Sequence, residues 1–99
     1  MGTATQDGSD GAIAIVSGAF TGAGQSSSVV LFGEYNLSLA FGGTASVNLE
    51  RSFDNGSSWK VVETYTASFE GLGEEIESGV LYRINCTAHT DDVTYRLSR

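Results

Sequence analysis

The chain has 99 residues, a formal net charge of −7 and a sequence pI near 4.3. This length predicts one domain, and the acidity disfavours bare nucleic acid and anionic membrane surfaces as partners. A single cysteine, Cys86, excludes an internal disulfide, and the CxxC spacing of a zinc site is absent. Thirteen glycines and many Ser, Thr and Asn residues predict a turn-rich β-protein.

Residues 1–11 are small and polar, a composition typical of a flexible N-terminal arm, and one domain is expected over 12–99. The arm has neither a basic n-region nor an apolar h-region, and the chain has no apolar run of about eighteen residues. We therefore expect synthesis in a cytoplasm without export. The arm offers four polar side chains as candidate contacts to a partner protein: Thr3, Thr5, Asp7 and Asp10.

The first half of the domain alternates between apolar and polar residues, which predicts strands. A first strand is expected over 12–18, and the stretch 19–27 is loop-like with room for a short edge strand. A short apolar strand, covered on both faces, is expected over 28–32. The clearest alternation runs over 35–41, where four apolar side chains share one face of a half-buried strand.

Residues 46–65 contain two alternating runs separated by an Asp-Asn-Gly-Ser turn, which predicts a β-hairpin. Asn55 and Gly56 tolerate the left-handed backbone that a tight turn requires. Strict alternation after the turn places four side chains on one face: Trp59, Val61, Glu63 and Tyr65.

Beyond this hairpin the pattern loosens. Residues 67–79, rich in glutamate and glycine, are expected to form a surface loop with one helical turn around Glu74. Strands are expected over 80–87 and 93–97, separated by a turn over 89–92. The total of about seven strands, with no segment of helical periodicity, predicts an all-β fold: an antiparallel β-sandwich or a jelly-roll-like barrel.

The hairpin turn carries a named motif. Ser52, Asp54, Gly56 and Trp59, with Ser58 at the hydroxyl position, resemble the Asp-box, S-x-D-x-G-x-T/S-W. The resemblance implies a structural turn in which the carboxylate accepts backbone N–H groups and the Trp packs beneath; a ligand role is the alternative. A sialidase-like hydrolase, in whose propellers Asp-boxes are best known, would need a longer chain and an arginine cluster, and one motif without repeats cannot build a propeller.

No catalytic, cofactor or metal constellation emerges from the remaining polar residues. The glutamates over 70–77 and the pair Asp91-Asp92 are expected to be solvated, with a loose calcium site as the alternative. His89 is expected to be an exposed turn residue and Cys86 a buried small hydrophobe. Arg51 is expected either to pair with Glu63 across the hairpin or to be turned outward by a bulge.

Three motifs occur in succession from Gly43 onward: V-x-L-x-R-S-F-D-x-G-x-x-W, E-x-G-V-L-Y-R and Y-R-L-S. In this respect the chain resembles small virion proteins of tailed bacteriophages, which are β-sandwich modules that decorate or cement a capsid or serve in the neck or tail. The resemblance implies that the apolar and aromatic motif residues are mostly scaffold: Val47, Leu49, Phe53, Trp59, Leu81, Tyr82, Tyr95 and Leu97.

These observations predict a non-enzymatic capsid decoration or cement protein, oligomeric and possibly trimeric, whose partner is the major capsid protein or another virion protein. The alternatives are a neck or tail accessory protein and a carbohydrate- or receptor-binding module of a head or tail fibre. Exposed aromatic side chains at Trp59, Tyr35 or Tyr65 would be the signature of the recognition module.

Overall fold

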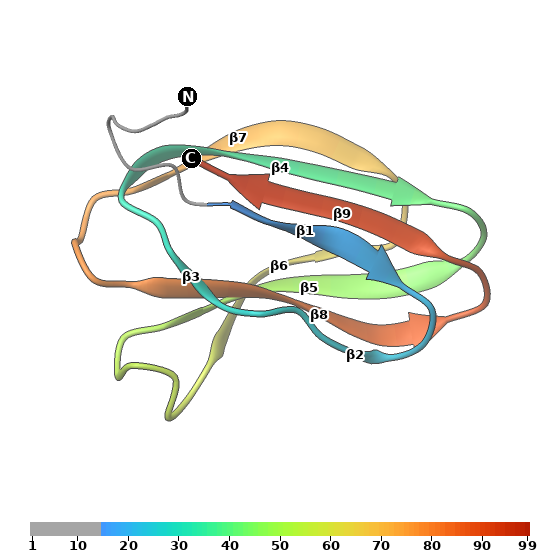
Figure 1. The fold of residues 1–99 in the computed structure, drawn as a ribbon, viewed down its shortest axis with the longest axis horizontal. Coiled ribbons are helices and arrows are strands. Elements are labelled where there is room, and N and C mark those ends of the chain that lie inside the picture. Colours follow the sequence, from blue (N-terminus) through green and yellow to red (C-terminus); the bar gives the residue numbers. More distant parts are fainter. Residues whose placement is uncertain (1–14) are drawn as a thin grey trace, which may run out of the picture.

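The computed structural model describes residues 15–99, and 65% of these described residues are in strands. The predicted arm over 1–11, with Thr3, Thr5, Asp7 and Asp10, lies outside the described residues. Over 15–99 there are nine strands and no helix (Figure 1), and so no helix in this range could cross a membrane. The strands are β1 (Ile15–Phe20), β2 (Gly24–Gln25), β3 (Val29–Val30), β4 (Gly33–Phe41), β5 (Ala45–Ser52), β6 (Lys60–Tyr65), β7 (Phe69–Glu75), β8 (Leu81–His89) and β9 (Val93–Ser98).

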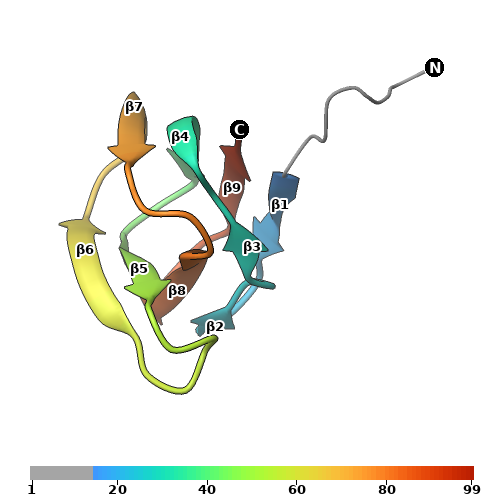
Figure 2. The same ribbon diagram turned by 90° about the vertical axis from the view of Figure 1, so that its left-hand side faces the viewer.

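The strands form two antiparallel sheets that pack face to face (Figures 1 and 2). Sheet A has the order β1-β9-β4-β7, and sheet B has the order β2-β8-β5-β6, with β3 also pairing with β8. When β2 and β3 are counted as one interrupted strand, this order is that of an eight-stranded jelly roll. The predicted antiparallel β-sandwich is therefore confirmed, and seven of its strands have six or more residues.

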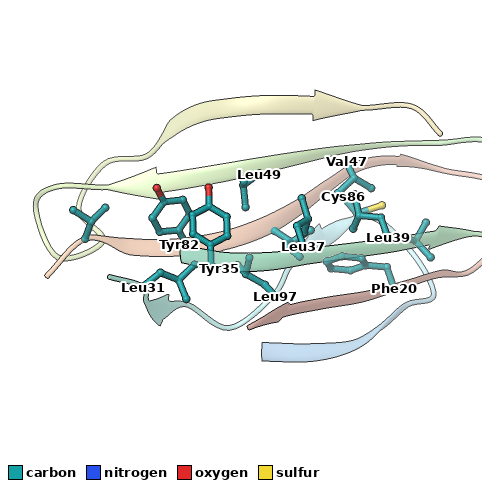
Figure 3. Packing of buried hydrophobic residues seen from close by; sticks show 13 residues of the cluster. Phe20, Leu31, Tyr35, Leu37, Leu39, Val47, Leu49, Tyr82, Cys86 and Leu97 are labelled. Carbon is teal, nitrogen blue, oxygen red and sulfur yellow. The ribbon is translucent and has the colours of Figure 1, made fainter. Parts of the chain in front are cut away.

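The core lies between the sheets and follows from the period-2 pattern of the long strands (Figure 3). Tyr35, Leu37 and Leu39 of β4 face inward, and the alternate residues of β8 from Tyr82 to Cys86 face them from sheet B. The rings of Tyr35 and Tyr82 lie side by side, with centroids 5.1 Å apart. The buried position predicted for Cys86 is confirmed, and burial raises the pKa of its thiol.

The predicted loop over 67–79 was wrong for most of its length, because β7 occupies Phe69–Glu75 and pairs with β4. Gly71 and Gly73 occupy inward positions of this edge strand, where an apolar side chain would be expected. The sequence of β7 therefore lacks the alternation that predicts a strand. The space where their side chains would lie is filled by the rings of Phe69 and Tyr35. The region around Glu74, predicted as a helical turn, is extended.

The hairpin of β5 and β6 is present, but its faces differ from the prediction. Leu49 pairs with Glu63 and Glu50 pairs with Val61, so Val62 is an extra residue that forms a β-bulge. The bulge places Glu63 and Tyr65 on the inward side and Val61 on the outer face. Phe53 is not scaffold: it is 48% exposed beside the turn, because the hairpin strand ends at Ser52.

Candidate functional site

The Asp-box turn between β5 and β6 is closed by Ser52 and Asp54. Asp54 Oδ1 accepts hydrogen bonds from Ser52 Oγ at 2.7 Å and from the Ser58 N–H at 2.8 Å, and Oδ2 accepts from Ser58 Oγ at 2.5 Å. The N–H of Gly56 donates to Ser52 Oγ at 2.8 Å. Asn55 and Gly56 have φ values of 58° and 92°, the left-handed region that the turn requires.

The electrostatics of this turn match its hydrogen bonds. The bonds from the Ser58 and Ser52 hydroxyls, together with the Ser58 N–H, lower the pKa of Asp54 to about 2. Both carboxylate oxygens are used within the turn, and the described hairpin places no histidine, cysteine or further acid against them. This geometry suits a structural turn.

Trp59 lies on the outer face of sheet B rather than in the core. Its ring packs against the Gly56 turn, and the Arg83 guanidinium carbon lies 4.2 Å from the ring centroid. Arg83 Nε donates to Glu50 Oε1 at 2.8 Å, and Asn85 Nδ2 donates to Glu50 Oε2 at 3.0 Å. Glu50, only 6% exposed, therefore fixes Arg83 over the indole and ties the hairpin to β8.

A second polar network crosses between the sheets. The Glu75 carboxylate, which is 3% exposed, accepts from Tyr82 Oη at 2.6 Å, from Arg51 Nη1 at 3.0 Å and from the Glu77 N–H at 3.1 Å. The predicted pairing of Arg51 with Glu63 was wrong, because Glu75 of β7 approaches Arg51 from the opposite sheet. Burial, together with the bond to Glu75, raises the pKa of Tyr82, so its phenol stays protonated and donates.

Glu50 and Glu75 make folding dependent on pH. Burial alone would raise their pKa values, but the hydrogen bonds and the neighbouring arginines outweigh burial and lower both pKa values below the ordinary 4.5. A depressed folded-state pKa gives stability that is present above the unfolded value and is lost as the pH falls through the folded value.

We therefore expect the unfolding temperature to be nearly constant from about pH 7 to about pH 5 and to fall steeply below about pH 4.5. Thermal unfolding followed by circular dichroism at a series of pH values would measure this. The double variant Glu50→Gln/Glu75→Gln is expected to give a flatter profile below pH 4.5. An unchanged slope in that variant would mean that other groups control acid unfolding.

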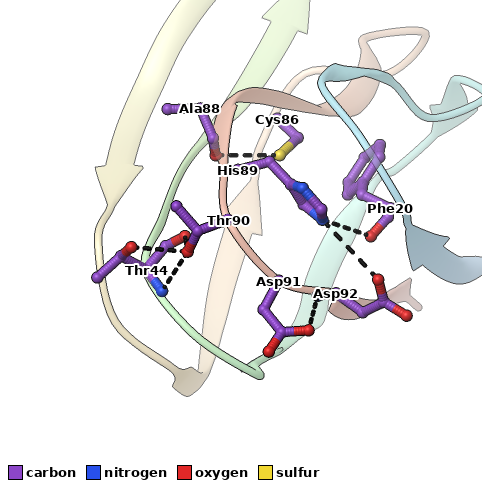
Figure 4. Close-up of polar contacts among 8 residues, drawn as sticks. All are labelled: Phe20, Thr44, Cys86, Ala88, His89, Thr90, Asp91 and Asp92. Carbon is purple, nitrogen blue, oxygen red and sulfur yellow. Dashed lines mark hydrogen bonds and ion pairs between the residues drawn. The ribbon is translucent and has the colours of Figure 1, made fainter.

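At the far end of β8, His89 is not the exposed turn residue that was predicted. Its side chain is 14% exposed, and Nε2 lies 3.1 Å from the carbonyl oxygen of Phe20 and 4.0 Å from Asp92 Oδ1 (Figure 4). Thr44 and Thr90 close the neighbouring connection through a 2.7 Å contact between their hydroxyls. The contacts of His89 join the end of β8 to the end of β1 and to the β8–β9 connection, which is a structural role.

Carboxylates do not gather into a metal centre in the part of the chain that the structure describes: no three His, Cys, Asp or Glu side chains over 15–99 are placed to hold an ion. Glu75 is occupied by Arg51 and Tyr82, whereas its neighbour Glu74 is exposed. The roles of Glu50 and Glu75 were missed in the sequence, because their arginine partners lie 33 and 24 residues away along the chain.

The exposed apolar side chains are unevenly distributed between the two ends of the sandwich. Phe32, Phe53 and Ile76 are exposed by 48%, 48% and 85%. They lie in the connections β3–β4, β5–β6 and β7–β8, all of which are on the left-hand side in Figure 1. We call these three residues the apolar end. The connections at the opposite end contain only Gly, Ala, Ser, Thr and Asp.

No family model matches this chain, and no curated protein sequence does. A solved structure with a similar fold is that of the Yersinia pseudotuberculosis-derived mitogen, with a TM-score of 0.54 and 17% sequence identity. The similarity covers 88% of this chain and 85% of that chain. At this identity the comparison shows a shared β-sandwich fold and carries no function with it.

Proposed function

We propose that this chain is a non-enzymatic virion protein of a tailed bacteriophage, a capsid decoration or cement protein that binds the head surface. The sequence resemblance from Gly43 onward supports the proposal. Four of its motif residues, on β5, β8 and β9, lie in the one core between the sheets: Val47, Leu49, Tyr82 and Leu97. Phe53 and Trp59 lie outside that core. The jelly-roll strand order also supports it, since this architecture recurs in viral capsid and lectin domains.

The observation that carries the proposal is the apolar end. Large apolar side chains exposed together mark an interaction surface, and here they belong to three separate connections that the fold brings to one end. The partner is the major capsid protein or another virion protein, and the chain acts as a homo-oligomer, with a trimer as the leading stoichiometry. Because copies on a lattice bind multivalently, each contact can be weak. In this proposal the protein is made in the host cytoplasm and enters the virion without export.

The test is occupancy on purified capsids that lack the protein. We expect wild type to bind saturably, and the double variant Phe32→Ser/Ile76→Ser to lose at least about tenfold in affinity, because both side chains would be buried in the contact. Deletion of residues 1–11 tests the arm separately, and loss of occupancy is expected there too.

The matched control is Val61→Ser, which removes an apolar side chain of similar exposure, 54%, from the outer face of β6. It is expected to bind like wild type. If wild type does not bind, or if the double variant and the control bind equally, the apolar end is not the docking surface. Equal occupancy after deletion of 1–11 would remove the arm from the proposal.

The second candidate function is a recognition module, which is favoured by Trp59 on a solvent-facing sheet beside Arg83 and Asn85. The other two aromatic candidates are occupied by the protein itself, since Tyr35 is 6% exposed and the Tyr65 ring packs tilted against Phe69, with centroids 4.6 Å apart. Arg83 likewise covers one face of Trp59.

We expect Trp59→Ala to lower the free energy of unfolding by about 1–2 kcal/mol, less than for a fully buried Trp. We also expect it to leave a glycan-array profile unchanged. Selective loss of a glycan signal by a variant that is still folded would establish the recognition module instead.

A further inference from the structure

The outer face of sheet A holds a shallow groove with a volume of about 500 Å³, in the range of small-ligand sites. It lies over the two central strands, β4 and β9, and is bounded by the edge strand β7. The residues that line it are Asn36, Leu37, Ser38, Glu70, Gly71, Leu72, Arg96 and Ser98.

Strand register builds the groove from two rows of side chains. Arg96, Ser38 and Glu70 are register partners across β9, β4 and β7, and Ser98, Asn36 and Leu72 form the next row. Neighbouring strands are about 4.8 Å apart, so each row spans about 10 Å. Six side chains from three distant segments thus face one hollow on the solvent side.

Arg96 differs from the other arginines of the chain. Arg51 and Arg83 are held by Glu75 and Glu50, and Arg99 donates to the carbonyl of Phe32. Arg96 forms no ion pair or side-chain hydrogen bond with any residue in 15–99, although it lines the groove. Within residues 15–99, nothing therefore occupies the donors of its guanidinium, whose planar fork suits a planar anion.

Ser98 gives a second, independent indication of a ligand. It is 4% exposed and lines the groove, yet its hydroxyl makes no hydrogen bond within the described part of the chain. Beside it, Ser38 Oγ donates to Glu70 Oε2 at 2.5 Å, which leaves Glu70 Oε1 and the Asn36 amide as acceptors and donors for a bound molecule.

The groove does not suit a peptide that binds as an added strand. β9 is paired with both β1 and β4, and β4 is paired with both β9 and β7, so their backbone groups are already satisfied. A ligand here must be recognised by side chains. The available groups are one guanidinium, an amide, two hydroxyls, a carboxylate and the apolar surface of Leu72, which is 72% exposed.

We propose that this groove binds an acidic saccharide of the hexuronic acid class. The Arg96 guanidinium pairs with the sugar carboxylate through two parallel N–H···O bonds. Asn36, Ser98 and Glu70 exchange hydrogen bonds with the ring hydroxyls, and Leu72 covers the C–H face of the ring. Glu70 repels the sugar carboxylate within the groove, so that carboxylate lies at the β9 end of the row, beside Arg96 and away from β7. Negative charges elsewhere on the chain oppose it less, because they are screened beyond about 8 Å at physiological ionic strength.

The test is an NMR titration of the full chain with D-glucuronate, D-glucose and propionate. We expect glucuronate to bind at least about tenfold more tightly than either of the other two, with shifts centred on the amides of 36–38 and 96–98. Arg96→Gln is expected to abolish the preference for glucuronate over glucose. Lys60→Gln, which removes one positive charge from sheet B, is the control and is expected to retain it.

Four outcomes would overturn the inference. They are no saturable shift with glucuronate, equal affinity for glucuronate and glucose, equal affinity for glucuronate and propionate, and equal losses in Arg96→Gln and Lys60→Gln. Unchanged dispersed spectra of both variants establish that they are folded. The inference stands apart from the virion proposal, because capsid occupancy and saccharide binding are measured separately.

Discussion

Glu75→Ala is expected to lower the free energy of unfolding by about 3 kcal/mol at neutral pH. Glu75 accepts three hydrogen bonds at the junction of the sheets, including one from the buried Tyr82 hydroxyl. Removal of one partner of a buried charge pair leaves the others unsatisfied and costs about 3–5 kcal/mol. We place Glu75 at the lower end because the Arg51 side chain is 38% exposed and can be rehydrated.

Urea denaturation would measure the loss, with Glu74→Ala as the matched control. Glu74 is the neighbouring residue of the same strand, but it is exposed and faces the solvent. Its replacement is expected to change stability by no more than about 0.5 kcal/mol. Similar losses in the two variants would mean that the network contributes no more than a surface glutamate does.

The fold class could be predicted because the sequence of a sheet with one buried face repeats every two residues. Tyr35 to Leu39 on β4 shows this pattern without interruption, and its buried residues are those expected. The hairpin turn was also predictable, since Asn55, Gly56 and the hydroxyl-carboxylate bonds around Asp54 are local in sequence. Features that depend on residues close together in the chain can thus be predicted from a single sequence.

The edge strands and the contacts between the sheets were less predictable, because their residues pack against partners that are distant in the sequence. β7 shows glycine where a core strand shows an apolar residue, since aromatic rings fill the inward positions. The bulge at Val62 divides between two faces the side chains of Val61, Glu63 and Tyr65, which were predicted to share one face. Neither feature has a sequence signal that can be read without the opposing strand.

The candidate sites also differ in whether their residues are close together or far apart in the sequence. The Asp-box turn is eight consecutive residues and could be found by inspection. The groove with Arg96 joins segments around Ser38 and Glu70 that are 32 residues apart. In the sequence Arg96 stands out only as part of the Y-R-L-S motif, because no local signal distinguishes an arginine with an acidic partner from one that lines a groove.

Gly73→Ala is expected to lower the free energy of unfolding by about 2–3 kcal/mol, although glycine to alanine usually stabilises an extended strand. A Cβ at this position would lie 2.4 Å from Tyr35 Cζ, a distance that requires the ring to move. Tyr35 is 6% exposed and packs on Tyr82, so its displacement disturbs the core, and such overpacking typically costs about 1–3 kcal/mol.

The expected loss follows from aromatic cover of an edge-strand glycine, a device by which a side chain from the neighbouring strand fills the space that glycine leaves. Gly22→Ala is the control, because a Cβ there meets no atom within 4 Å and its backbone is not left-handed. Gly22→Ala should leave stability unchanged or raise it by up to about 1 kcal/mol through the unfolded chain. Urea denaturation of both variants would measure the difference in the free energy of unfolding. If Gly73→Ala is as stable as Gly22→Ala, a Cβ at position 73 does not displace the Tyr35 ring at a cost in stability.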